Sequence, residues 1–181
     1  EYKKPTIKIE TAHLFFDIYQ DYTDVHSTML MVKEDIEEQE CSLMGEQLEL
    51  VEIQVDQQVL GQSDYSKSEK HLTFTVKNKQ TEVSIKTRIY PAKNYSLEGL
   101  YISDGIYCTQ NEPEGFRKIT YYLDRPDILS KFTTVIEADR ENYPILLSNG
   151  NPSDAKECEG GRHQVTWIDP FPKPSYLFAL V

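Results

Sequence analysis

Apolar side chains recur at every second position over much of this chain, and that period constrains the fold more than any other feature. Leu72, Phe74 and Val76 alternate with other residues, and Ile7 and Ile9 are spaced in the same way. A period of two places side chains on one face of a β-strand, whereas a helix needs a period of about 3.6. The pattern therefore predicts strands that each bury one face.

The composition favours the same structure. Val, Ile, Thr, Tyr, Phe and Trp together make up 57 of the 181 residues, whereas Ala, the best helix former, occurs five times. β-Branched and aromatic side chains pack well on a half-buried sheet and lose rotamer freedom in a helix. We therefore expect an all-β fold, either an antiparallel β-sandwich or saddle-shaped curved sheets, with at most one or two short helices.

The local pattern also predicts where strands and turns lie. The alternation slips by one residue near Ala12-His13, which indicates a bulge or a break. Asn149-Gly150 and Gly160-Gly161 predict reversals, because Gly adopts positive φ without steric cost. The expected strands are 7–9, 14–18, 25–32, 48–55, 72–76, 83–89, 117–123, 133–138, 143–148, 164–168 and 175–181.

Three further segments are interpreted from their residue types. Residues 124–132 predict the one short helix, because Pro126 would stand in its first turn beside acidic residues. Residues 169–174 contain three prolines, which cannot donate to a β-ladder, so a rigid connection is expected there instead of a central strand. The acidic run 34–40 is expected to be a solvated surface, because calcium sites need compact acidic loops of defined spacing.

The charge of the chain excludes some classes of partner. The formal net charge is -11 at pH 7, and a surface of that sign repels phosphate backbones and anionic membranes. No apolar run approaches the roughly 18 residues that a membrane-spanning helix needs. We therefore expect neither nucleic acid nor a membrane as a partner.

The cysteines bear on the cellular compartment, and the chain ends bear on the domain organisation. Cys41, Cys108 and Cys158 lie far apart, form no Cys-x-x-Cys motif and are odd in number, which favours a reducing, cytoplasmic compartment. Residue 1 is not Met, and the sequence stops within an apolar segment. From these ends we expect residues 1–181 to be a single β domain excised from a larger protein.

Sequence motifs for catalysis or metal binding are missing. His13, His26, His71 and His163 include no pair four residues apart and no His-Glu-x-x-His, and there is no Gly-x-Ser-x-Gly and no phosphate-binding loop. An isolated His in a strand pattern is far more often a surface or hydrogen-bonded residue than a metal ligand. We therefore assign neither a metal site nor a catalytic residue to this chain.

Several strings resemble the N-terminal domain of the bacterial aminopeptidase N family, which are zinc exopeptidases of the gluzincin type. In chain order they are LEGLYIS (97–103), YCTQNEPEGFR (107–117), ITYYLDRPD (119–127), YPILLSNGN (143–151), GRH (161–163) and WIDPFPKPSYLFALV (167–181). The first ninety or so residues are similar in pattern alone. The resemblance implies a saddle-shaped β-domain that precedes a separate catalytic domain.

This resemblance implies an activity, a cofactor and partners. Members of the family remove single residues from peptide N-termini, so the substrates would be peptides with free N-termini and the other partner would be the parent chain's catalytic domain. In the family, His-Glu-x-x-His with a distant Glu binds zinc, and a Gly-x-Met-Glu-Asn loop grips the substrate. Those residues would lie after Val181, so the resemblance implies zinc in the full-length enzyme and an inactive, zinc-free fragment.

The resemblance also implies a binding role for the segment Thr109-Gln-Asn-Glu112. Glu112 would pair with the α-ammonium group of the substrate, and Gln110 would line the pocket for its first side chain. A fixed carboxylate suits this task, because it favours a cation and leaves a blocked N-terminus unpaired. The alternative is that Glu112 and Glu114 are ordinary surface carboxylates beside Arg117.

The remaining candidates are interpreted as structural. Arg117, Arg125 and Asp127 are expected to form a local polar network, and Cys108 is expected to pack as a small apolar residue. The aromatic residues near the C-terminus predict either interdomain packing or a sugar-stacking strip; they are Trp167, Phe171, Tyr176 and Phe178. The second reading gives the alternative function, a non-catalytic β-sandwich module that binds carbohydrate or protein.

Overall fold

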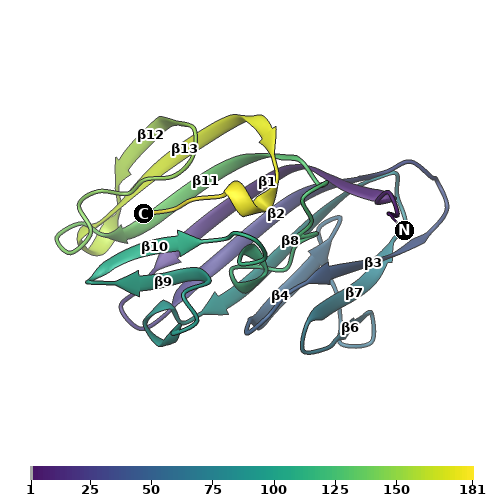
Figure 1. The fold of residues 1–181 in the computed structure, drawn as a ribbon, viewed down its shortest axis with the longest axis horizontal. Coiled ribbons are helices and arrows are strands. Elements are labelled where there is room, and N and C mark those ends of the chain that lie inside the picture. Colours follow the sequence, from purple (N-terminus) through teal and green to yellow (C-terminus); the bar gives the residue numbers. More distant parts are fainter. Residues whose placement is uncertain (1) are drawn as a thin grey trace.

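One large sheet of eight strands forms the centre of the computed structural model, which describes residues 2–181 (Figure 1). Its strand order is β12-β13-β11-β1-β2-β8-β4-β5. All neighbours are antiparallel except β1 and β11, which run parallel. The strands are β1 (Ile7–Ile18), β2 (Thr23–Lys33), β4 (Glu49–Val55), β5 (Gln58–Val59), β8 (Gln80–Ile89), β11 (Ser130–Asp139), β12 (Asn151–Glu157) and β13 (Arg162–Lys173).

Two smaller sheets complete the fold within residues 2–181. The first is the hairpin of β9 (Gly99–Ser103) and β10 (Ile106–Gln110), drawn in front of the large sheet in Figure 1. The second joins β3 (Gln39–Met44), β7 (His71–Val76) and β6 (Tyr65–Lys67) at the other end. The helices are single 3-10 turns, η1 (Pro91–Lys93), η2 (Phe116–Lys118), η3 (Glu159–Gly161) and η4 (Ser175–Leu177).

The core lies between the large sheet and the elements that cover it. Phe16 of β1 stacks on Phe178 of the C-terminal segment with their ring centroids 5.8 Å apart. At the other end, the Sγ of Cys41 in β3 lies 4.0 Å from the Sδ of Met31 in β2. All four side chains are buried. This layered arrangement confirms the expected all-β, sandwich-like fold, and Leu72, Phe74 and Val76 of β7 are buried on one face as expected.

Residues 124–132 do not form the expected helix, so that prediction was wrong. The chain makes a turn in which the amide N of Ile128 lies 3.2 Å from the carbonyl O of Arg125, and β11 begins at Ser130. Arg125 also pairs with Asp127 at 2.6 Å, which favours this turn. Proline and acidic residues are as typical of a turn as of a first helical turn.

The strand expected at residues 117–123 is also wrong. Its first two residues complete η2, and Tyr122 forms a single bridge with Met44. Residues 119–122 are all buried in succession, so the apparent alternation does not reflect one buried and one exposed face. The prediction failed because other elements cover this segment on all sides, so its apolar residues are buried without forming a strand.

The two strands expected at residues 143–148 and 175–181 are not formed, and a single isolated β-bridge takes their place. The backbones of residues 143–148 and 175–181 pair through the bridge Ser148–Leu180 and the reciprocal bonds between Leu147 and Val181. Phe178 is buried in the core whereas Phe171 is 74% exposed, so the four aromatic residues do not form one exposed strip.

The other differences concern bulges and edges. The irregularity in β1 falls between Ile9 and Thr11 and leaves one continuous strand. A bulge in β4 leaves Val51 exposed, although its two-residue spacing from Ile53 within the expected strand 48–55 would place both on one face. Strand β13 continues through the prolines to Lys173, but β12 pairs with it only up to Ile168, so the proline-rich part lies at an edge.

Some elements were not predicted from sequence. β12 is exposed along its whole length and therefore shows no apolar alternation. β5 and β6 are two and three residues long, and β3 begins within the acidic run, of which residues 34–38 are exposed as expected. No helix among residues 2–181 has the length and apolar character to cross a bilayer.

Candidate functional site

The candidate site lies where β10 ends and the chain turns into η2. We call residues 110–115 the β10–η2 loop. Its turn is closed by the amide N of Gly115, which lies 3.0 Å from the carbonyl O of Asn111. A Cβ atom on Gly115 would come within 2.2 Å of the carbonyl O of Gln110. Only glycine therefore allows the two ends of the loop to approach this closely.

Successive side chains of this segment point in opposite directions. Asn111 is buried, and its Nδ2 lies 2.7 Å from the carbonyl O of Phe178, while Thr109 Oγ1 accepts the amide N–H of Leu180 at 2.9 Å. Gln110 and Glu112 are both exposed, because residues two apart in an extended segment lie on the same side. The inward residues attach the loop to the C-terminal segment, and the outward ones are available to a ligand.

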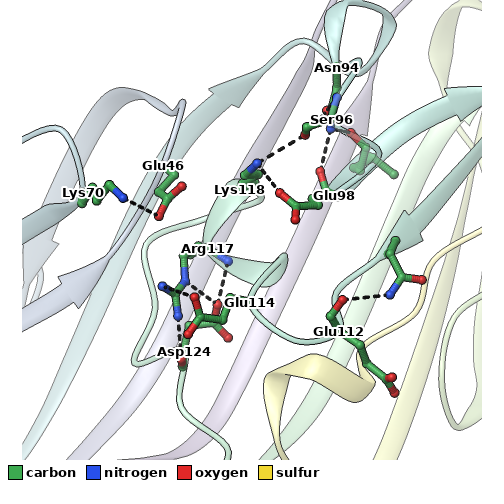
Figure 2. Close-up of polar contacts among 12 residues, drawn as sticks. Glu46, Lys70, Asn94, Ser96, Glu98, Glu112, Glu114, Arg117, Lys118 and Asp124 are labelled. Atoms are coloured by element: carbon green, nitrogen blue, oxygen red, sulfur yellow. Dashed lines mark hydrogen bonds and ion pairs between the residues drawn. The ribbon is translucent and has the colours of Figure 1, made fainter.

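The side chain of Gln110 contacts the backbone of Glu112. The Nε2 of Gln110 lies 3.1 Å from the carbonyl O of Glu112, and the carboxylate of Glu112 extends away from the neighbouring cations (Figure 2). The two residues to which the family resemblance assigns substrate binding thus lie on the same exposed side of the loop.

Glu112 differs from the other carboxylates of this region in having no cationic partner among residues 2–181. The others are all paired, as Figure 2 shows: Glu114 and Asp124 with Arg117, Glu98 with Lys118, and Glu46 with Lys70. The interpretation of Glu114 as a surface carboxylate beside Arg117 fits its 3.1 Å ion pair, but Glu112 takes no part in that pair.

A buried polar cluster supports the loop from below. The Nε of Arg117 lies 2.9 Å from Oδ2 of Asp124, and the Oγ of Ser175 lies 2.5 Å from Oδ1 of the same carboxylate. Arg125 and Asp127 form a separate ion pair, so the expected network of Arg117, Arg125 and Asp127 is corrected to two clusters. Ser175 was not predicted to belong to this cluster, because it lies 51 residues from Asp124 in the chain.

The guanidinium of Arg125 also affects the titration of its partner. It holds the pKa of Asp127 near 2, well below the ordinary value for an aspartate, because the hydrogen-bonded ion pair favours the charged form. This pair lies at the start of the turn before β11 and does not contact the β10–η2 loop.

An apolar groove of about 390 Å³ runs beside β10 but does not include Gln110 or Glu112. Exposed apolar side chains in its lining include Ile106, Ile145 and Leu147. Burial raises the pKa of Tyr107, at the groove's inner wall, to about 12. The groove is thus an apolar surface with a neutral phenol, distinct in chemistry from the charged loop.

The described residues do not fit a zinc ion. No group of three or more His, Cys, Asp or Glu within residues 2–181 is placed to hold a metal. The Nε2 of His163 donates to the carbonyl O of Tyr143 at 2.7 Å, and burial beside Lys86 lowers the pKa of His26.

The three cysteines are all unpaired in the structure. Cys41 is buried, and desolvation raises the pKa of its thiol to about 12. Cys108 and Cys158 are half-buried. A raised thiol pKa disfavours the reactive thiolate, so Cys41 serves in packing.

Known proteins are similar to this chain along its whole length. Aminopeptidase N of Escherichia coli (strain K12) is 44% identical over 181 residues, which cover 100% of this chain and 21% of that protein. Aminopeptidase N of Caulobacter vibrioides is 42% identical with the same coverage. The chain therefore spans about a fifth of the length of the curated relatives that it matches.

Solved structures show the same fold. Legionella pneumophila aminopeptidase A in complex with aspartic acid superposes with a TM-score of 0.93 and 32% identity, over 99% of this chain and 22% of that one. An M1 zinc metallopeptidase from Deinococcus radiodurans has a TM-score of 0.82 at 14% identity, over 98% of this chain and 42% of that one, and shows the fold alone. The model of the Peptidase M1 N-terminal domain matches residues 9–177, and the chain belongs to that family.

Proposed function

We propose that this chain is the N-terminal domain of a zinc aminopeptidase, and that Glu112 supplies the carboxylate that binds the α-ammonium group of the peptide substrate. Family membership and the relatives named Aminopeptidase N support the aminopeptidase activity. The unpaired state of Glu112 supports the role of the residue.

That unpaired carboxylate is the observation on which the proposal rests. A carboxylate gains most from a cation when no other cation already neutralises it. Glu114 is two residues away with the same backbone parity, yet its charge is engaged by Arg117. Glu112 is therefore the residue of this loop that is best able to bind a substrate ammonium group.

Gln110 contributes in a different way. Its amide Nε2 is already bonded to the carbonyl O of Glu112, so its side chain is held against the backbone of that residue. In this proposal Gln110 forms one wall of the pocket for the first side chain of the substrate. Its contact would affect the choice of substrate more than the binding of the ammonium group.

The zinc and the reacting groups belong, in this proposal, to the rest of the full-length protein. The described residues contain no cluster that fits a metal, and the chain spans about a fifth of its relatives. We accordingly expect the 181-residue chain alone to bind no zinc and to release no amino acids. We place the full-length enzyme in the cytoplasm, which the three unpaired cysteines support.

The test is the substitution Glu112→Gln in the full-length protein. It removes the charge but keeps the shape, and loss of one partner of a desolvated ion pair costs about 2–5 kcal/mol, which is roughly 30-fold to several thousand-fold in kcat/KM. The measurement is steady-state hydrolysis of a peptide with a free N-terminus.

Glu114→Gln is the matched control, because it removes a carboxylate from the same loop. It breaks one exposed ion pair, so kcat/KM should stay within about two-fold of the original. Equal kcat/KM for Glu112→Gln and the unaltered enzyme would contradict the proposal.

A further inference from the structure

The β10–η2 loop is attached to the core by the side chains that alternate with Gln110 and Glu112. Thr109 and Asn111 both reach the backbone of residues 178–180, on the side opposite to the exposed pair. A single extended segment therefore has one binding face and one attached face. The position of the exposed face therefore depends on the contacts that Thr109 and Asn111 make on the attached face.

Asn111 makes the more specific of these contacts. It is 3% exposed, its Nδ2 donates to the carbonyl O of Phe178 at 2.7 Å, and its Oδ1 is buried with no partner among residues 2–181. Burying a polar side chain with one group unsatisfied destabilises the fold. An apolar residue would fill such a position at lower cost, so packing alone does not account for an amide here.

The carbonyl that Asn111 contacts is itself held rigidly. The ring of Phe178 packs against Phe16, Phe116 and Phe132, with centroid separations of 5.8, 5.3 and 5.8 Å. Close-packed aromatic rings permit little displacement. Through the bond to Phe178, Asn111 transfers this fixed position to the loop.

We propose that Asn111 is the positioning residue for Glu112, and that Thr109 assists it. This inference rests on the proposed function of Glu112 as the group that binds the substrate ammonium. The Cα atoms of residues 111 and 112 are about 3.8 Å apart across one peptide unit, so a displacement of Asn111 displaces Glu112 with it. A misplacement of about 1 Å at a binding group costs up to about 100-fold in rate.

A double-mutant cycle in the full-length protein tests this. Asn111→Ala should lower kcat/KM for a free-amine peptide by about ten-fold, within the range expected for a misplaced group. In the Glu112→Gln background the same substitution should change kcat/KM by less than about two-fold, because the group that it positions is gone. A purely structural role would give the same loss in both backgrounds and would overturn the inference.

Thr109→Val provides a second, milder variant that keeps the side-chain shape and removes only the hydroxyl that accepts from Leu180. We expect a loss of about three-fold in kcat/KM that also disappears when Glu112 is Gln. If Asn111→Ala does not fold, this variant carries the cycle alone. An equal loss in both backgrounds would again overturn the inference.

Asn149→Ala is the matched control. The Nδ2 of Asn149 donates to the carbonyl O of Leu177 at 3.1 Å, and its Oδ1 accepts from the amide of Ala179 at 2.7 Å, so it holds the same C-terminal segment without touching the loop. We expect kcat/KM within about two-fold of the original. A loss that is coupled to Glu112 would show that the segment as a whole, and not Asn111, sets the position.

The two levels of the proposal fail differently. An unchanged kcat/KM for Glu112→Gln would overturn both the ammonium-binding role and the positioning role. A large loss for Glu112→Gln together with uncoupled or silent Asn111→Ala would leave the ammonium-binding role intact and overturn only the positioning role.

Discussion

The interior of the large sheet and the β10–η2 loop are stabilised in opposite ways. Inside the sheet, residues such as Phe16 and Met29 are fully buried among many apolar neighbours, and no single contact decides their place. In the loop and its support, Asn111 and Asp124 are buried polar groups, each held by a few directed hydrogen bonds. Many weak packing contacts stabilise the fold as a whole, whereas a few directed hydrogen bonds fix the position of a particular segment.

This difference separates the two outcomes of a substitution. Removal of an apolar side chain from the sheet should mainly lower the free energy of unfolding, because many weak contacts are lost at once. Removal of a directed polar contact should displace the loop or leave a buried group unpaired. The following predictions test whether the two regions behave as differently as their contacts suggest.

The largest effect is expected in the sheet interior. Phe16→Ala removes a fully buried ring that stacks on Phe178, and should lower the free energy of unfolding by about 3–5 kcal/mol. Urea denaturation measures this. Phe15→Ala is the matched control, because Phe15 lies on the other face of the same strand and is only half-buried. Equal losses for the two variants would contradict the assignment of the buried face.

A comparable loss of stability, which a second substitution should partly restore, is expected for the buried ion pair of Arg117 and Asp124. Arg117→Met leaves the buried carboxylate of Asp124 without its cation and should cost about 3 kcal/mol of stability. The double variant Arg117→Met/Asp124→Leu removes both charges, so it should be more stable than Arg117→Met alone. Urea denaturation of the original protein, of the single variants Arg117→Met and Asp124→Leu, and of the double variant measures this. Strictly additive losses would show that the pair is not coupled.

The smallest of these effects depends on pH. Asp24 in β2 accepts from Arg88 at 2.7 Å and lies 3.1 Å from the Nζ of Lys86, and these hydrogen bonds hold the pKa of its carboxyl below 3.8. Asp24→Asn should therefore cost about 1.5–3 kcal/mol at pH 7.

The sign of the pH dependence follows from that lowered pKa. The ion pair stabilises the fold at every pH above the unfolded value of 3.8, and its contribution is lost as pH falls through the folded value. The difference in unfolding free energy between the original protein and Asp24→Asn should thus shrink below pH 3.8. A difference that stays constant down to pH 2 would contradict this assignment.

Sequence reasoning succeeded where burial is periodic. In β7, Leu72, Phe74 and Val76 are buried while their neighbours are not, so the strand and its face were both predictable. In β4 a single bulge turned Val51 outward, and no local signal marks that extra residue. The alternation of apolar residues indicates which side chains can be buried. The register of strand pairing, however, is set by partner strands elsewhere in the chain.

The candidate site was predictable only in part. Glu112 and Gln110 were identified through family resemblance, and their shared exposure agrees with their spacing. Asn111 and Ser175 were missed, because their partners lie 67 and 51 residues away in the sequence. Asp124 was assigned to a helix that does not exist, since its real role is fixed by a cation seven residues earlier and a hydroxyl near the C-terminus.

The parallel pairing of β1 with β11 has a consequence for how the protein is made. Thr11 lies opposite Lys131, so β1 gains its second neighbour only after about 120 further residues have left the ribosome. Until then one edge of this long strand is open, and long-range pairing of this kind forms slowly. The nascent chain therefore passes through a stage in which five of the eight strands can pair while β1 still has an open edge, and chaperones would matter most at that stage.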